Sequence, residues 1–381
     1  MVLQANFSWP EYIDGDAFRT AQSAIRFKET PLTPLKVAIG MGIANEDWEG
    51  TASYVLEAER LGVDSVWSAE SWGHDAATPL AFLAGRTSRI RLGAGIMQVS
   101  GRTPAMTAMT AMTLASMSND RFILGLGASG PQVVEGWHGQ QFGSTVQRLR
   151  EVIEIVRQLT LGGRSSYEGE LYRLPRPGGE GKPIKSAARV RPEPIPVFLA
   201  TLSPKSLELT GEIADGWVGT SFMPEHADVF FTPMARGAAR AGRSMDAIER
   251  MAGGVVHFTD DVAAALPARK PGLAFTLGAM GSRRHNFYNA AFQRAGYADI
   301  AQEVQRLYLE GRRAEAAELV PDEMVLKSNL LGTEAMVKER LRAYRDCGIT
   351  SVRVDPMGAS TAERIETLGR VVALVEELNR E

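Results

Sequence analysis

Residues 36–68, KVAIGMGIANEDWEGTASYVLEAERLGVDSVWS, contain the unit that decides the fold. The first seven residues form a nearly continuous apolar run, which is typical of a β-strand that is buried on both faces. Residues 47–61 repeat apolar residues at helical spacing, and Gly62 follows as a helix stop signal. Residues 64–68 are apolar again. The stretch therefore predicts a β-strand, an α-helix and a second β-strand.

The same alternation continues along the chain. Further strands are predicted at residues 90–97, 121–127, 195–201, 215–220, 253–259 and 350–354, and further helices at 77–87, 104–117, 144–160, 204–214, 224–241 and 361–379. Alternating strands and helices require a mostly parallel sheet. Eight such strands favour a (β/α)8 TIM barrel, although a doubly wound open sheet has the same periodicity. We therefore expect an α/β fold, and a (β/α)8 barrel in particular.

The chain is longer than a barrel requires. It has 381 residues, whereas a typical barrel needs about 250. The excess lies in an N-terminal arm at residues 1–34, in a Gly- and Pro-rich stretch at 161–195 and in a largely helical insert at 261–330. We expect residues 35–381 to form a single barrel domain that carries these two insertions.

Composition excludes several classes of protein. Lys and Arg number 42 and Asp and Glu number 45, so the net charge of −3 favours neither a nucleic acid nor an anionic membrane as a partner. No apolar run approaches the roughly 18 residues of a membrane helix, and the first residues do not resemble a secretory signal. We expect a cytoplasmic protein with a small-molecule substrate. The single cysteine, Cys347, and five histidines without H-x-x-x-H spacing predict no metal site.

Three glycines follow the fourth predicted strand in the pattern G-x-G-x-x-G, at Gly125, Gly127 and Gly130. A dinucleotide-binding fingerprint also needs a helix that opens at the third glycine and an acidic residue about 20 positions further on, at the end of a strand. Pro131 follows at once, and the region about 20 residues on is helical, so this context disfavours a Rossmann dehydrogenase. The pattern instead favours a loop whose bare backbone lies against a flat ring, or a tight strand exit without a ligand.

Two further stretches at strand ends can carry chemistry. Residues 91–98, RLGAGIMQ, end in glycines, which suits either a ligand clamp or a strand of small core residues. Residues 67–75, WSAESWGHD, place Glu70 and His74 after the second strand, where a carboxylate and an imidazole can serve as acid and base. The alternative for both side chains is an ordinary solvated loop.

Several stretches resemble the bacterial-luciferase-like superfamily. They are GVDSVWSAESWGHDAATPLAFLA, RIRLGAGIMQVSGRTPAMTAMTAMTL, RFILGLGASGPQVVEGWHGQQF and EIADGWVGT. Within that superfamily, SGPQVVEGWHG, GAMGSRRHNFYN and AEAAELVPDEMV are similar to the branch that uses the deazaflavin coenzyme F420 rather than FMN. The resemblance covers about residues 35–360. It implies a (β/α)8 barrel with an insertion, in agreement with the strand count.

The resemblance also implies an activity and a site. The expected enzyme is an F420-dependent oxidoreductase that transfers a hydride between the deazaflavin C5 and a small organic substrate, with Glu70 and His74 as catalytic residues that handle the accompanying proton. A backbone bulge after the third strand, often a non-prolyl cis peptide, would support the ring at Gly95-Ile96. The residues expected to bind the coenzyme are Gly95, Ile96, Met97, Gly127, Ala128, Ser129, Gly130, Val133, Ala200, Thr201, Leu202, Ser203 and Lys205.

The chain departs from some members of this branch. Sugar-oxidising relatives place a Glu in the short glycine loop and a His at the exit of the first strand, whereas this chain has Ala128-Ser129-Gly130 in the first place and Ile-Ala-Asn-Glu after Gly42 in the second. Sugar-phosphate dehydrogenase activity is therefore not expected. Two alternatives remain, an FMN-dependent monooxygenase on the same barrel and a coenzyme-free barrel that acts as a binding protein. Because homodimers are common in the superfamily, we expect a homodimer.

Overall fold

The computed structural model describes residues 33–41, 46–191 and 193–381. Most of the predicted N-terminal arm, residues 1–32, therefore lies outside the described residues, as does most of the turn after the first strand. Residues Pro34–Glu381 form one compact unit.

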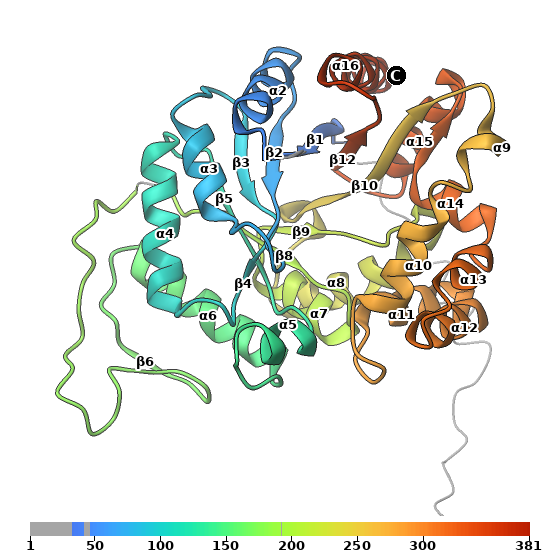
Figure 1. Cartoon of the computed structure of the whole chain (residues 1–381). Coiled ribbons are helices and arrows are strands. Elements are labelled where there is room, and N and C mark those ends of the chain that lie inside the picture. Colours follow the sequence, from blue (N-terminus) through green and yellow to red (C-terminus); the bar gives the residue numbers. More distant parts are fainter. Residues whose placement is uncertain (1–32, 42–45, 192) are drawn as a thin grey trace, which may run out of the picture. The chain divides into compact units, whose positions relative to one another are not determined.

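Within the described residues, eight parallel strands close into a barrel (Figure 1). In order around the ring they are β1 (Lys36–Gly40), β2 (Ser65–Ser68), β3 (Arg91–Ala94), β5 (Phe122–Gly127), β8 (Val197–Ala200), β9 (Gly216–Val218), β10 (Glu249–Phe258) and β12 (Ser351–Pro356). The last strand pairs with the first in parallel register, with Val352 opposite Val37. The closed ring confirms the predicted barrel and excludes the open sheet.

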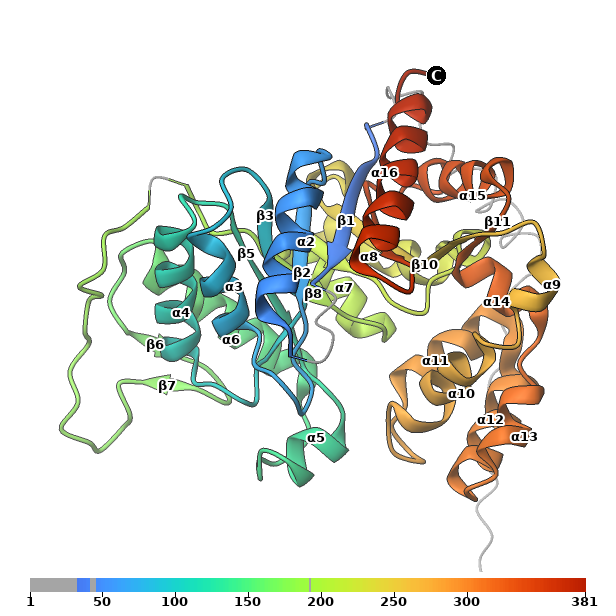
Figure 2. The same cartoon turned by 45° about the horizontal axis from the view of Figure 1, so that its top comes forward.

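An outer layer of helices covers the barrel (Figures 1 and 2). These helices are α2 (Trp48–Arg60), α3 (Ala77–Ala84), α4 (Pro104–Met117), α6 (Thr145–Thr160), α7 (Pro204–Ile213), α8 (Asp228–Arg240), α15 (Glu334–Asp346) and α16 (Thr361–Leu378). Short polar residues begin several of them, because a side-chain oxygen satisfies a backbone N–H that the first turn leaves free. Thr103, for example, accepts from the N–H of Met106 at the start of α4.

The barrel interior is filled at its middle and hollow at one end. Trp67, Ile123, Phe198 and Met251 point inward from four strands and pack against one another in a separate apolar cluster. Successive residues of a strand point to opposite faces, so the inward position after Ile123 is Gly125 and the next is Gly127. These glycines make room for the segment that follows β3, and the cavity lies beyond it at the carboxyl ends of the strands, which is the end where TIM barrels place their active sites.

The third predicted strand is broken where the sequence predicted one continuous run. Strand β3 ends at Ala94, the Gly95-Ile96 peptide bond is cis, and the chain resumes as β4 (Met97–Gln98), which pairs with β5. The cis bond confirms what the family resemblance implied. A short helix, α5 (Pro131–Gly136), follows the glycine loop, and the sequence analysis did not predict it.

The two insertions take different forms. Residues 161–195 carry a small hairpin, β6 (Tyr167–Glu168) and β7 (Arg173–Leu174), whose turn donates backbone N–H groups to the buried carboxylate of Glu151. The second insertion is helical, as predicted, and Figure 2 labels its helices. They are α9 (Val262–Ala265), α10 (Lys270–Ala279), α11 (Phe287–Phe292), α12 (Ala298–Leu309), α13 (Arg313–Glu318) and α14 (Asp322–Ser328).

The helical insertion has an apolar core of its own, which includes Leu277, Phe292, Val304 and Met324. It returns to the barrel through β11 (Leu330–Gly332), which pairs with the carboxyl end of β10. This strand begins at the last residue of the predicted insert, and the sequence analysis did not predict it. Within the described residues, no helix has the length and apolar character needed to cross a membrane.

Candidate active site

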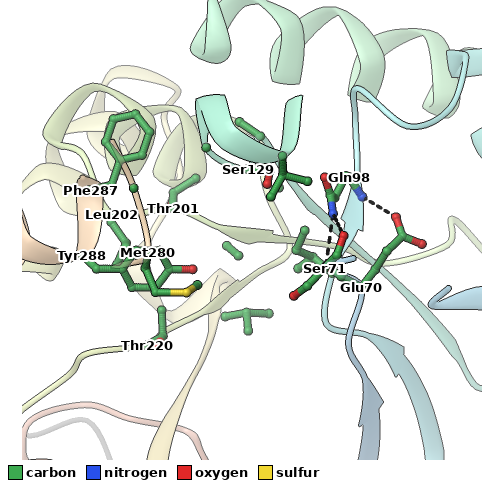
Figure 3. A pocket seen from close by; sticks show the side chains of 18 of the residues that line it. Glu70, Ser71, Gln98, Ser129, Thr201, Leu202, Thr220, Met280, Phe287 and Tyr288 are labelled. Atoms are coloured by element: carbon green, nitrogen blue, oxygen red, sulfur yellow. Dashed lines mark hydrogen bonds between the residues drawn. The ribbon is translucent and has the colours of Figure 1, made fainter. Parts of the chain in front are cut away.

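A cavity of about 620 Å³ lies at the carboxyl ends of the barrel strands. Its walls come from the loop after β2, the cis segment after β3, the glycine loop after β5, the loop after β8 and the helical insertion (Figure 3). Most of the residues that the sequence analysis proposed for the coenzyme and substrate line it, namely Glu70, Gly95, Ile96, Gly127, Ala128, Ser129, Gly130, Val133, Ala200, Thr201, Leu202 and Ser203.

Three of the proposed residues do not line the cavity. The ring of His74 packs edge-on against Trp48, with 5.1 Å between ring centroids, and its side chain is 44% exposed. Met97 is fully buried and packs into the layer between strands and helices. Lys205 is exposed in the first turn of α7. The structure therefore separates these three side chains from the residues that surround the cavity.

The two glycines at the end of β5 are required by a close approach of two chain segments. A Cβ atom at Gly125 would lie 1.7 Å from the carbonyl oxygen of Ala94, and a Cβ atom at Gly127 would lie 2.7 Å from Cδ1 of Ile96. Only glycine lets the end of β5 pack so closely against the cis segment. Because both segments then present backbone and small side chains to the cavity, they form a flat wall suited to a planar ring.

Glu70 holds the cis segment in place. Its carboxylate accepts hydrogen bonds from the backbone N–H of Gln98 at 3.0 Å and of Ala76 at 3.0 Å, and from Nη1 of Arg102 at 2.6 Å. Gln98 also contacts the loop that carries Glu70, because its Nε2 donates to the carbonyl oxygen of Ser71 at 2.7 Å. Figure 3 shows Glu70, Ser71 and Gln98 together on one side of the cavity.

The protonation state of Glu70 follows from these contacts. Burial on its own would raise the pKa of the carboxyl group, but the hydrogen bond from Arg102 and those from the two backbone N–H groups outweigh burial and lower the pKa below its ordinary value. Glu70 is therefore an ionised hydrogen-bond acceptor at neutral pH. A carboxylate in this state has no proton to donate.

Hydrogen bonds from the barrel and from the helical insertion hold the loop after β8 in place. Trp217 Nε1 donates to the carbonyl oxygen of Thr201 at 3.0 Å, and Ser203 begins α7 by accepting from the N–H of Ser206. From the insertion, Nη2 of Arg294 donates to the carbonyl oxygen of Leu202 at 2.5 Å. These bonds join the insertion to the barrel at the edge of the cavity.

The cavity wall also includes residues that the sequence analysis did not assign to coenzyme binding or to catalysis. They are Ala69, Ser71, Trp72, Gln98, Gln132, Gly136, Trp137, Thr145, Leu149, Ser206, Val218, Gly219, Thr220, Ala279, Met280, Gly281, Phe287, Tyr288 and Arg353. Gln98 ends the RLGAGIMQ stretch and Tyr288 lies in GAMGSRRHNFYN, so both belong to stretches that the sequence analysis had singled out for other reasons. Arg353 was detectable as the one charged residue within the apolar run of the last predicted strand.

The chemical character of the cavity is mostly neutral. Glu70 and Arg353 are the charged side chains among its described lining residues, and hydroxyl, amide, aromatic and aliphatic groups make up the rest. Burial raises the pKa of Tyr288, so its phenol stays protonated at neutral pH. No group of three or more His, Cys, Asp or Glu residues is placed to hold a metal ion in the parts of the chain that the structure describes.

Comparison with known proteins shows the family. A sequence model of the luciferase-like monooxygenase family matches residues 32–351. The Mycobacterium tuberculosis protein named "Putative coenzyme F420-dependent oxidoreductase Rv3520c" is 40% identical over 328 residues, which are 84% of this chain and 94% of that protein. A 5,10-methylenetetrahydromethanopterin reductase of Archaeoglobus fulgidus is 27% identical over 84% of this chain and 93% of its own. The chain belongs to the luciferase-like family.

Solved structures share the fold. The coenzyme F420-dependent tetrahydromethanopterin reductase from Methanopyrus kandleri superposes with a TM-score of 0.69 at 24% identity, over 88% of this chain and 97% of its own. An F420-dependent secondary alcohol dehydrogenase in complex with an F420–acetone adduct superposes with a TM-score of 0.67 at 17% identity, over 90% of this chain and 99% of its own. Both likenesses show the same barrel.

Proposed function

We propose that this chain is an F420-dependent oxidoreductase that exchanges a hydride with a small organic substrate. The observation that carries the proposal is the flat wall of the cavity, built by the Gly95-Ile96 segment and the glycines at the end of β5, in a chain 40% identical to a protein named as F420-dependent. When bound, F420 supplies a hydride-carrying carbon at C5 of its deazaflavin ring.

The residues of the cavity fit a planar coenzyme. A side chain larger than hydrogen at Gly127 would push Ile96 toward the space that the ring needs, because the added Cβ would lie 2.7 Å from Cδ1 of Ile96. Gln98 contributes a buried Oε1 atom that has no hydrogen-bond partner among the described residues. A buried acceptor without a partner is costly, and an N–H of a bound ring would satisfy it.

In this proposal, different residues of the cavity bind the coenzyme, position the cis segment and hold a proton. The glycine loop and the loop from Ala200 to Ser203 bind and orient the coenzyme, with the hydroxyls of Thr201 and Ser203 near its polyol chain. Glu70 positions the cis segment through Gln98 and carries no transferable proton. The neutral phenol of Tyr288 holds the proton that accompanies hydride transfer, in a cavity whose apolar walls exclude water.

The proposal also makes testable statements about Glu70, His74 and Lys205, which the sequence analysis assigned to the site. Glu70 stays in the site as a positioning residue, whereas His74 packs on Trp48 outside the cavity and has no reacting group to contact there. Lys205 lies in the first turn of α7, next to the loop proposed for the polyol chain and phosphate, so it contributes charge at the rim rather than contact within the cavity.

Oxygen consumption separates this function from the monooxygenase alternative. Purified protein is mixed in air with reduced F420 or with reduced FMN, and oxygen uptake is followed with and without a panel of ketones and unsaturated carbonyl compounds. We expect no oxygen uptake above the protein-free rate with either coenzyme, and oxidation of reduced F420 only when an organic acceptor is present. Protein-dependent oxygen uptake with reduced FMN would contradict the proposal.

We also propose that the protein is a cytoplasmic homodimer. The family resemblance supports the dimer, and the outer face of α4 leaves Met106 and Met109 more than half exposed. Cys347 is a free thiol, as is usual in a reducing compartment. Light scattering on the eluting protein should give twice the chain mass of 41.3 kDa, and a monomer mass would remove the dimer from the account.

A further inference from the structure

Arg353 is the one cationic side chain among the described residues that line the cavity. It lies on β12, between Ser351 and Asp355 on the face of the strand that points into the barrel. Its side chain is 37% exposed, so the charge keeps contact with water while it lies on an otherwise mostly neutral wall. A single charged group placed on such a wall is typical of a group that orients a ligand. The position of Arg353 therefore needs an explanation.

The neighbouring strands keep space for the guanidinium group. Ala38 of β1 and Gly253 of β10 lie opposite Arg353 in the two parallel registers that flank β12. At Gly40, the next inward position of β1, an added Cβ would lie 3.2 Å from Nη2 of Arg353. Small residues on both sides thus leave the guanidinium room inside the cavity.

The guanidinium is poorly satisfied by the protein itself. Its Nε atom is buried and has no hydrogen-bond partner among the described residues. Its ion-pair contact is with Asp355, at 3.5 Å between Nη2 and Oδ1, which is longer than a normal charge-assisted hydrogen bond. A guanidinium has five N–H donors in a fixed fork, so donors remain for a ligand in the cavity.

Because of the position of β12 in the ring, a ligand of Arg353 would lie on the side of the cavity opposite the proposed coenzyme wall, where the substrate would bind. Three strands lie between β12 and β5 in either direction, so Arg353 lies across the barrel from the glycine loop that forms the proposed coenzyme wall. The insertion that follows β10, the neighbour of β12, supplies Tyr288, Met280 and Phe287 to the cavity. Figure 3 shows these three side chains together, on the side opposite Glu70 and Gln98.

We propose that Arg353 binds a carboxylate of the substrate, and that the site therefore takes a small organic acid with an apolar body. The guanidinium fork matches the two oxygens of a carboxylate, and the apolar body would contact Met280 and Phe287. This inference rests on the proposed function, because it takes the opposite wall as the place of the coenzyme. Asp355 competes with the substrate carboxylate for the same guanidinium.

Benzoate and its neutral analogue benzamide are suitable probes, since they differ in charge and hardly in shape. Binding of each is measured by calorimetry to the F420-loaded protein and to the protein without coenzyme. Wild-type protein should bind benzoate at least about tenfold more tightly than benzamide, and Arg353→Gln should lose that preference. Arg353→Lys should keep part of it, because lysine retains the charge and loses the fork.

Two further variants sharpen the test. Asp355→Asn should raise benzoate affinity by about threefold, because it removes the competing carboxylate while Arg353 stays in place. Arg283→Gln is a matched control, since Arg283 is exposed in the insertion loop close to the cavity and does not line it. It should leave benzoate affinity unchanged. If Arg353→Gln is unstable by thermal unfolding, Asp355→Asn and Arg353→Lys decide the question.

Coenzyme affinity, measured by F420 fluorescence in the same variants, separates the two proposals. We expect Arg353→Gln to bind F420 as wild type does. Equal affinity of wild type for benzoate and benzamide, or unchanged benzoate binding in Arg353→Gln, overturns the carboxylate site. A large loss of F420 affinity in Arg353→Gln also overturns it and assigns Arg353 to the coenzyme. Failure of wild type to bind F420, with benzoate binding that depends on Arg353, would overturn only the proposed function.

Discussion

Glu70 and Arg102 form an ion pair of 2.6 Å between Oε1 and Nη1 at the edge of the cavity, with side chains that are 9% and 17% exposed. The pair joins the loop after β2 to the segment between β4 and α4. Because Glu70 also accepts from the N–H of Gln98, the ion pair fixes the chain directly after the cis bond. The pair therefore supports the wall proposed for the coenzyme.

Replacing Glu70 by Gln should therefore affect stability and coenzyme binding together. The change removes the nearer of the two carboxylates around Arg102, while Asp75 stays 3.8 Å away, and should lower the free energy of unfolding by about 2 kcal/mol. It should also weaken F420 binding, since the cis segment loses its anchor. Urea unfolding and F420 fluorescence measure the two effects. Glu57→Gln is the control, because its pair with Arg60 is exposed and worth less than about 1 kcal/mol.

The contribution of Glu70 should depend on pH in one direction. Its pKa is lowered in the folded state, so the stabilisation is complete above the ordinary carboxyl pKa of about 4.3 and is lost as the pH falls through the lower folded-state pKa. The difference in unfolding free energy between wild type and Glu70→Gln should thus shrink only in acid. A difference that varies between about pH 5 and pH 8 would be evidence against an ionised, paired Glu70.

The two glycines at the end of β5 should respond differently to substitution by alanine. In Gly127→Ala the new methyl group meets the side chain of Ile96, which can move, so the protein should fold while F420 affinity falls by roughly tenfold. In Gly125→Ala the methyl group meets the carbonyl of Ala94, which cannot move, so stability should fall by about 3 kcal/mol.

Gly85→Ala is the control for both glycine variants, because nothing lies within 4 Å of an added Cβ there and its φ is −82°. Its unfolding free energy should stay within about 1 kcal/mol of wild type. Thermal unfolding and F420 titration measure all three variants. Unchanged F420 affinity in Gly127→Ala would show that the coenzyme does not lie against this wall.

Tyr288 and His74 should differ in their effect on turnover. Tyr288→Phe removes the proton donor and should lower the rate of hydride transfer by about a hundredfold, with F420 affinity intact. His74→Ala should stay within about twofold of wild type, because its ring lies outside the cavity. The rates come from oxidation of bound reduced F420 by an acceptor found in the panel. Equal losses in the two variants would restore the catalytic role that the sequence predicted for His74.

Asn289 offers a test of how the insertion reaches the site. Its buried side chain donates to the carbonyl oxygens of Leu277 at 2.9 Å and Ala301 at 2.6 Å, and so joins three helices one residue after Tyr288. Asn289→Ala should loosen the insertion and slow turnover while F420 affinity changes little. Hydrogen exchange should increase over residues 270–309 and not in β1 to β5. Increased exchange throughout the barrel would mean that the insertion is not a separate packing unit.

The barrel could be predicted because its signals are local. Apolar runs and helical spacing are properties of short windows, and the helix predicted at residues 104–117 matches α4 at both ends. The break after Ala94 was not visible in the same way, since the apolar run continues through Ile96 and Met97. The cis bond there was expected only from the family resemblance.

Site residues at the ends of barrel strands could be predicted from the sequence. Residues whose position depends on how a loop or insertion folds could not. Gly127 ends β5 and Thr201 directly follows β8, so the topology alone brings them to one end. His74 is four residues from Glu70 in sequence, but the loop turns its ring onto Trp48. Tyr288 reaches the cavity from an insertion whose packing depends on its own core, and no local pattern shows which insertion residue faces the barrel.

The most direct test of the central claim is equilibrium binding of the purified protein to F420 and to FMN, side by side, followed by their intrinsic fluorescence. The account predicts micromolar binding of F420 and binding of FMN that is at least about tenfold weaker. Tighter binding of FMN would contradict it and favour the monooxygenase, and binding of neither would leave a barrel without the proposed coenzyme.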